Sequence, residues 1–184
     1  MLNLEHWLRS FSQHNKQASN IYVAIVAQAR HPLFYTRYGV QDTATGRYEL
    51  LVLHVAIVLA ALRHCEPMNG PISRGVVEAF VTDMDDNLRE LGVGDMSVPK
   101  RVKKASAGLL ERSGDYIKDL KGNDKHSLSD HISEYFEGQK AEFMLYSLIE
   151  YTFSAYRDLS QDQADMTGRG TVMFPNPADH VSQL

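Results

Sequence analysis

The chain has 184 residues, of which 43% are hydrophobic and 23% charged, with a formal net charge of −4 at pH 7. This length and composition are typical of one globular domain, and the negative charge excludes nucleic-acid binding through overall charge, so any anion must be bound by a local basic patch. The single cysteine, Cys65, excludes an internal disulfide and a cysteine metal cluster and fits a reducing compartment.

The first forty residues predict short amphipathic helices. Residues 1–7 contain no basic segment followed by an apolar run and are not rich in Arg and Ser, so we expect neither a secretory signal nor a transit peptide, and we expect a cytoplasmic protein. Apolar residues at helical spacing predict one helix over 3–11 and another over 20–30. Pro32 restarts the chain, and a short helical turn follows that ends at Gly39.

A central helix is predicted from about Arg47 to His64. The thirteen residues from Leu50 to Leu62 are apolar apart from His54. This run is shorter than the roughly 20 residues that span a bilayer, so we expect a core helix buried on most sides.

The second half of the chain predicts four more helices, over 73–91, 98–120, 127–136 and 141–159. From Ser160 the composition becomes polar, with glycine and proline, which predicts an irregular arm over 161–184. The predicted fold is therefore all-α: a single-domain bundle of about six or seven helices in residues 1–160, built around the central helix and followed by the arm.

Four cations crowd the first turns of the helix over 98–120: Lys100, Arg101, Lys103 and Lys104. Gly92 and Gly94 end the preceding helix, and Ser97 as the N-cap, with Pro99, starts this one. A helix N-terminus carries partial positive charge, so each cation there costs from a few tenths to roughly 1 kcal/mol. The cations lie opposite the apolar stripe of their helix and therefore face solvent or a partner.

Two interpretations of this basic face stay open. In the first, the cations pair with Asp83, Asp85 and Asp86 of the preceding acidic helix. In the second, they meet an anionic partner, which could be RNA, an anionic membrane surface or an acidic protein segment. Aromatic residues are not interleaved with the cations, which argues against single-stranded nucleic acid.

The sequence shows no catalytic or metal-binding constellation, and we expect no metal, cofactor or catalytic residue. None of the eight histidines has the spacing of a metal-ligand pair. The chain contains no G-x-S-x-G motif, P-loop or dinucleotide-binding glycine pattern. His54 is expected to be a neutral, hydrogen-bonded core residue. An enzyme that uses His54 in a pocket is the alternative.

Three stretches, in order, resemble the ubiquinol–cytochrome c chaperone family. They read Y-x-x-I-V-x-Q-A-R-x-P-x-F-Y at 22–35, Y-G-V-x-D-T-x-x-G-R-x-E-L-L-x-L-H at 38–54, and F-x-x-D-M-D-x-x-L-R-E-x-G-V-G-D-x-x-V-P-K at 80–100. The resemblance extends from about Ile21 to Leu159. The motif residues of greatest interest are Asp42, Thr43, Arg47, His54, Asp83, Asp85, Gly92, Gly94 and Pro99.

The resemblance implies a helical, non-enzymatic, cofactor-free assembly chaperone that binds newly made cytochrome b of respiratory complex III. Mitochondrial members also work beside the ribosome with a small partner protein. Without a transit peptide, this chain resembles a bacterial member. We expect a monomer in the cytoplasm, and leave open a peripheral contact with the inner membrane or the ribosome.

A chaperone for a membrane protein needs an apolar groove that shields part of a transmembrane segment. The candidates for client contact are Phe34, Tyr35, Tyr38, Phe143, Met144 and Tyr146. Asp42, Thr43 and Arg47 are expected to cap and pair around the start of the central helix. The alternative function is an RNA- or ribosome-binding factor that acts through the Lys100–Lys104 face.

Overall fold

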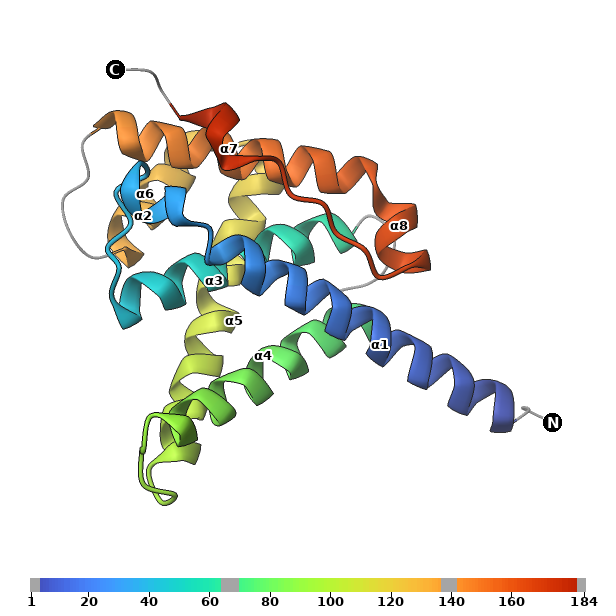
Figure 1. The fold of residues 1–184 in the computed structure, drawn as a ribbon. Helices are drawn as coiled ribbons and strands as arrows, with labels where there is room; N and C mark the ends of the chain where they lie inside the picture. The colour runs from blue at the N-terminus through green and yellow to red at the C-terminus, as the bar shows by residue number, and fades with distance from the viewer. Residues whose placement is uncertain (1–3, 64–69, 137–141, 182–184) are drawn as a thin grey trace.

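The structure is a computed structural model that describes residues 4–63, 70–136 and 142–181, and within these ranges all regular structure is helical (Figure 1). This confirms the prediction of an all-α bundle. His64 and Cys65 lie outside the described residues. The elements in chain order are α1 (Leu4–Ala29), α2 (Pro32–Thr36), α3 (Ala44–Leu62), α4 (Pro71–Glu90), α5 (Val98–Gly122), α6 (Lys125–Tyr135), α7 (Glu142–Gln161), α8 (Gln163–Gly168) and the 3-10 helix η1 (Pro177–His180).

Helix α3 is the centre of the bundle, as the sequence predicts. It packs against α1, α5 and α7, and its residues from Leu50 to Leu62 are all buried. At 19 residues, α3 is long and apolar enough to cross a membrane, which corrects the expectation that this segment is too short; 83% of its apolar window is buried inside the fold. The burial identifies α3 as a core helix. Thr43 caps it by accepting a hydrogen bond from the Gly46 amide at 3.1 Å.

Helix α1 is one continuous helix, which corrects the prediction of separate helices over 3–11 and 20–30. Residues 12–19 are mostly polar but contain neither glycine nor proline, so nothing interrupts the hydrogen-bond ladder. Gln17 and Ala18 in this stretch are buried. Gly75 of α4 allows the close crossing with α1, since a Cβ there would lie 2.6 Å from the Ala18 Cβ.

Part of the segment after α7 is helical, which corrects the expectation of an irregular arm for residues 163–168 and 177–180, whereas residues 169–176 have no regular structure. The segment forms α8, returns past α1 and ends in η1 beside α2 and α7 (Figure 1). Gln17 donates hydrogen bonds to the carbonyls of Thr167 at 2.8 Å and Gly168 at 2.9 Å, and the Tyr38 hydroxyl donates to the carbonyl of Pro177. The segment therefore covers part of the core.

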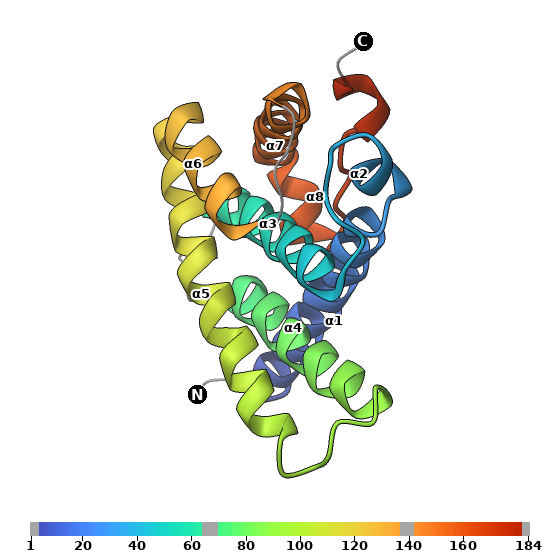
Figure 2. The same cartoon turned by 90° about the vertical axis from the view of Figure 1, so that its left-hand side faces the viewer.

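The connection between α4 and α5, residues 91–97, lies at one extreme of the molecule in two perpendicular views (Figures 1 and 2). Gly92 turns the chain with a φ of +73°, a value that favours glycine. Ser97 occupies the N-cap position of α5, as predicted, but its side chain makes no capping hydrogen bond. Its backbone is already αR, whereas a capping residue is normally extended.

Candidate functional site

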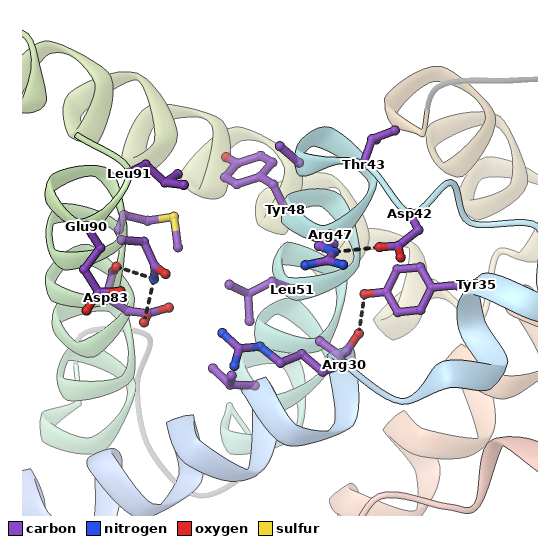
Figure 3. Close-up of a pocket in the computed structure, with 15 residues that line it drawn as sticks. Arg30, Tyr35, Asp42, Thr43, Arg47, Tyr48, Leu51, Asp83, Glu90 and Leu91 are labelled. Atoms are coloured by element: carbon purple, nitrogen blue, oxygen red, sulfur yellow. Dashed lines mark hydrogen bonds and ion pairs between the residues drawn. The ribbon is translucent and has the colours of Figure 1, made fainter. Parts of the chain in front are cut away.

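A cavity of about 600 Å³ opens between the end of α1, the start of α3 and the second half of α4 (Figure 3). Its floor is apolar because each of these helices turns part of its hydrophobic stripe inward. Leu51 of α3 is 8% exposed, and Val26 and Met84 are half-buried. The apolar and aromatic lining residues are Val26, Ala29, Tyr35, Ala44, Tyr48, Leu51, Met84 and Leu91.

Basic side chains stand on the α1 and α3 side of the cavity. Arg47 is held by Asp42 in an exposed ion pair of 2.6 Å, and the hydrogen bond from Arg47 lowers the pKa of the Asp42 carboxyl. This pairing around the start of α3 was predicted from the sequence. Arg30 is exposed, and its guanidinium makes no hydrogen bond or ion pair within the described part of the chain.

Acidic side chains stand on the opposite side, along α4 (Figure 3). Asp83 accepts hydrogen bonds from the Tyr22 hydroxyl at 2.8 Å and from the Asn87 amide at 2.9 Å. Burial first, and then Asp83, raise the pKa of Tyr22. Glu90 is exposed, and its carboxylate has no partner among the described residues. Within the described part of the chain, the cavity thus has a cation without a partner on one wall and a carboxylate without a partner on the other.

A second cavity, of about 510 Å³, lies on the other side of Tyr48, between the start of α3 and α5. The Tyr48 hydroxyl donates to the Ala105 carbonyl at 2.8 Å, and burial raises the pKa of Tyr48 to about 12. Arg112 is paired at 2.9 Å with Glu49, which is only 2% exposed. The cations left on this wall are Arg101 and Lys104.

The basic face Lys100, Arg101, Lys103 and Lys104 points to solvent. All four side chains are exposed, and none forms an ion pair with a residue that the structure describes. Arg89 pairs with Asp85 of α4 at 2.5 Å and with Asp95 of the α4–α5 connection at 2.9 Å, and Asp83 accepts hydrogen bonds from Tyr22 and Asn87. Asp86 forms no ion pair among the described residues. Of the two interpretations, pairing with α4 is therefore wrong for the described structure.

The predicted client-contact residues are scattered. Tyr35 lines the first cavity, where its hydroxyl donates to the Ala29 carbonyl at 2.8 Å. Phe34 and Tyr38 have no exposed surface, so their predicted role in client contact is corrected to a core role. The three candidates on α7 lie outside the cavity lining: Phe143 and Met144 are half-buried, and Tyr146 is 57% exposed.

His54 is fully buried on the side of α3 that faces α7. The Leu50 carbonyl can only accept, so His54 Nδ1 carries the proton and donates to it at 2.7 Å; Nε2 then accepts from the Tyr151 hydroxyl at 2.9 Å. Gln28 in turn donates to the Tyr151 oxygen at 2.9 Å. Burial lowers the pKa of His54 to about 4. The ring is neutral and closed off, as expected, and the hypothesis that it acts in an open pocket is wrong.

The remaining motif residues shape the backbone around the cavity and the α4–α5 connection. Gly92 and Gly94 lie in that connection, and Pro99 occupies the first turn of α5. Gly46 was quoted only as part of a motif, but a Cβ there would lie 2.1 Å from the Gln41 carbonyl oxygen, so the start of α3 requires glycine. Over the described ranges, no group of three or more His, Cys, Asp and Glu side chains is arranged to hold a metal ion.

Several cavity residues were not singled out from the sequence: Arg30, Tyr48, Leu51, Met84, Asn87, Glu90 and Leu91. A signal was available for most of them. Arg30, Leu51, Met84 and Glu90 stand inside the three quoted stretches, and Tyr48, Asn87 and Leu91 fall between matched positions of the second and third. The stretches are far apart in sequence, so only the fold shows that they meet around one cavity.

The fold and the site define an all-α protein with an open, apolar-floored cavity between charged walls. The sequence model described as ubiquinol-cytochrome C chaperone matches residues 36–170, so the chain belongs to the ubiquinol–cytochrome c chaperone family. This confirms the resemblance seen in the sequence, and with it a role in complex III assembly. The stretch at 22–35 lies outside the matched residues.

A solved structure supports the same family. The crystal structure of the Cbp3 homolog from Brucella abortus superimposes with a TM-score of 0.79 at 30% sequence identity, covering 97% of this chain and 99% of that one. Comparison with curated proteins gives no match.

Proposed function

We propose that this protein is an assembly chaperone that binds newly synthesised cytochrome b in the 600 Å³ cavity between α1, α3 and α4. One observation carries the proposal: the three stretches that resemble the family surround this cavity. Arg30 comes from the first, Arg47 and Leu51 from the second, and Asp83 and Met84 from the third. Family membership supports the chaperone role, and cytochrome b is the client that the resemblance implies.

The cavity suits a few apolar side chains of a hydrophobic segment. Its volume lies in the range of about 300–1,000 Å³ that is usual for binding sites, and its floor is apolar. Helix-in-groove recognition places successive apolar anchors of a client helix on such a floor. Met84 adds an unbranched side chain that adapts to different shapes.

The two walls would orient the client. Arg30 and Glu90 face the cavity mouth without a partner among the described residues. A charge at either end of the bound segment would find its complement on one wall only, which selects one direction of binding. The proposed chaperone binds a client segment without catalysing a reaction, and it acts as a cytoplasmic monomer.

Substitutions that add a positive charge to the cavity lining test this proposal. Leu91→Lys adds a cation to an apolar lining residue that is 80% exposed, and Met84→Lys does so deeper in the cavity. Each tagged variant is expressed in the host in place of the natural protein, and the cytochrome b that co-purifies is measured. We expect about a tenfold loss or more, because an interface anchor is worth roughly 1.4 kcal/mol or above.

The matched control is Met173→Lys, since Met173 is 76% exposed and lies outside the cavity lining. This variant should recover cytochrome b at the natural level, and assembled complex III should fall only with the cavity variants. Equal recovery of cytochrome b by the cavity and control variants, with all of them folded, would refute the assigned cavity. Natural levels of complex III after deletion of the gene would refute the function.

A further inference from the structure

We propose that the α4–α5 tip (residues 91–97), together with the basic face of α5, is a docking surface for an anionic lipid bilayer. The inference does not depend on the identity of the client. It rests on three features of this end of the molecule: unpaired cations, protruding apolar side chains, and their position beside the candidate cavity.

The cations have no structural role within the described chain. Lys100, Arg101, Lys103 and Lys104 are all exposed and unpaired there, in a protein whose net charge is −4. They also occupy the helix end where positive charge is disfavoured. Of the carboxylates near the tip, Asp85 and Asp95 are bridged by Arg89, whereas Asp86 and Glu90 form no ion pair among the described residues, so the four cations outnumber the unpaired carboxylates beside them. A concentrated basic face of this kind attracts a surface of opposite charge.

The tip adds apolar side chains to this charge. Met96 is 97% exposed and Leu91 80%, which are the two highest values among the large apolar side chains that the structure describes. Peripheral membrane proteins combine these features: apolar side chains enter the boundary between headgroups and acyl chains, and basic side chains meet anionic headgroups.

An RNA partner would use the surface differently. Proteins that bind single-stranded nucleic acid stack the bases on aromatic side chains, and residues 91–104 contain none. Protruding methionine and leucine side chains would gain nothing from a phosphate backbone. The observations therefore favour a bilayer over RNA.

The proposed docking surface lies beside the candidate cavity. The tip projects at one end of the molecule in both views (Figures 1 and 2). Leu91 also lines the mouth of the first cavity, while Arg101 and Lys104 line the second, and Tyr48 and Ala44 line both. A bilayer that meets the tip would thus lie next to the cavity proposed for a membrane-protein client.

Vesicle flotation with the purified full-length protein tests the proposal. The probes are vesicles of phosphatidylglycerol and phosphatidylcholine in equal amounts, and vesicles of phosphatidylcholine alone. Binding to the anionic vesicles is expected to weaken as salt rises, and the neutral vesicles should bind little. Each basic residue near such a surface contributes about fivefold to binding, so changing all four cations to Gln should weaken binding about 100-fold or more.

A charge-matched control separates the local surface from net charge. Arg37, Arg74, Lys118 and Lys121 are also exposed and unpaired among the described residues, and their joint change to Gln removes the same charge. This variant should keep most of the binding. Met96→Asp should lower anionic-vesicle binding severalfold, whereas Met96→Ala should lower it less.

Circular dichroism and thermal unfolding of each variant show that the fold is intact. The proposal is overturned if the basic-face variant and its charge-matched control bind the anionic vesicles equally. It is also overturned if the basic face binds ribosomes or RNA at physiological salt and the four changes abolish that binding while leaving vesicle binding intact.

Discussion

The polar side chains on the two sides of helix α3 differ in how they are paired. On the side facing α7, His54, Tyr151 and Gln28 satisfy one another in a closed chain of hydrogen bonds. On the side facing α1 and α4, Arg30 and Glu90 remain without partners among the described residues. A buried polar group must be paired, so pairing marks the groups that hold the fold, whereas an unpaired charge at a cavity mouth is available to a partner.

Two adjacent aromatic residues show the same contrast. Phe34 is fully buried and packs edge-on against His54 and Tyr151, with ring centroids at 5.2 and 4.9 Å. Tyr35, the next residue, turns away and lines the open cavity. Residue type alone would assign both to the same role, and burial separates them.

The largest expected effect tests the packed aromatic cluster on the side of α3 that faces α7. Phe34→Ala should lower the free energy of unfolding by about 3–5 kcal/mol, because it leaves a cavity in a packed aromatic cluster. Tyr146→Ala, at a 57% exposed position, should change it by no more than about 0.5 kcal/mol. Urea unfolding of both variants measures the difference. Similar losses for the two would contradict the division between core and surface aromatics.

A smaller effect should follow from the closed chain around His54. The folded protein lowers the pKa of His54 to about 4, whereas the ordinary value is 6.5, so the unfolded state binds the proton more readily between these two pH values. Stability is therefore complete above about pH 6.5 and falls as the pH drops toward 4, by a total of roughly 3 kcal/mol from this residue.

The free energy of unfolding measured across this pH range tests the assignment. His54→Gln removes the titrating group and should flatten this part of the profile relative to the natural protein. An unchanged slope in that variant would show that other groups cause the acid sensitivity.

The smallest effect should come from the unpaired cations at the start of α5. Lys100→Gln with Arg101→Gln should raise stability by a few tenths of a kcal/mol per residue at low salt, since both cations lie near the N-terminus of α5 and oppose its dipole. The gain should shrink at high salt, where screening weakens the repulsion. Thermal unfolding at two salt concentrations measures both. A loss of stability would instead mean that the cations take part in favourable internal pairing.

The sequence predicted the parts of the fold that depend on local pattern. The run from Leu50 to Leu62, apolar apart from His54, identified the central helix, and Thr43 was expected to cap its start. Asp42 and Arg47 pair beside this start as expected. The resemblance of three stretches identified the family, which the comparisons confirm.

The predictions that the structure corrects concern places where segments distant in sequence meet. Nothing in the residues around Phe34 and Tyr38 indicates that Pro177 will return to cover them. Likewise, the polar residues in the middle of α1 led to a prediction of two separate helices. The sequence around Gln17 does not show that this residue is buried against α8, because that contact depends on the tertiary fold. The cavity joins residues from α1, α3 and α4, so its existence depends on helix crossing and not on any one motif.

The packing of the segment after α7 also bears on how the protein is made. Its hydrogen bonds to Gln17, Gln28 and Tyr38 join residues that are 139 to 151 positions apart. Such contacts form late, since a long loop must close before they stabilise anything. During translation, the aromatic core around His54 can therefore be completed only after residues 167–177 have left the ribosome.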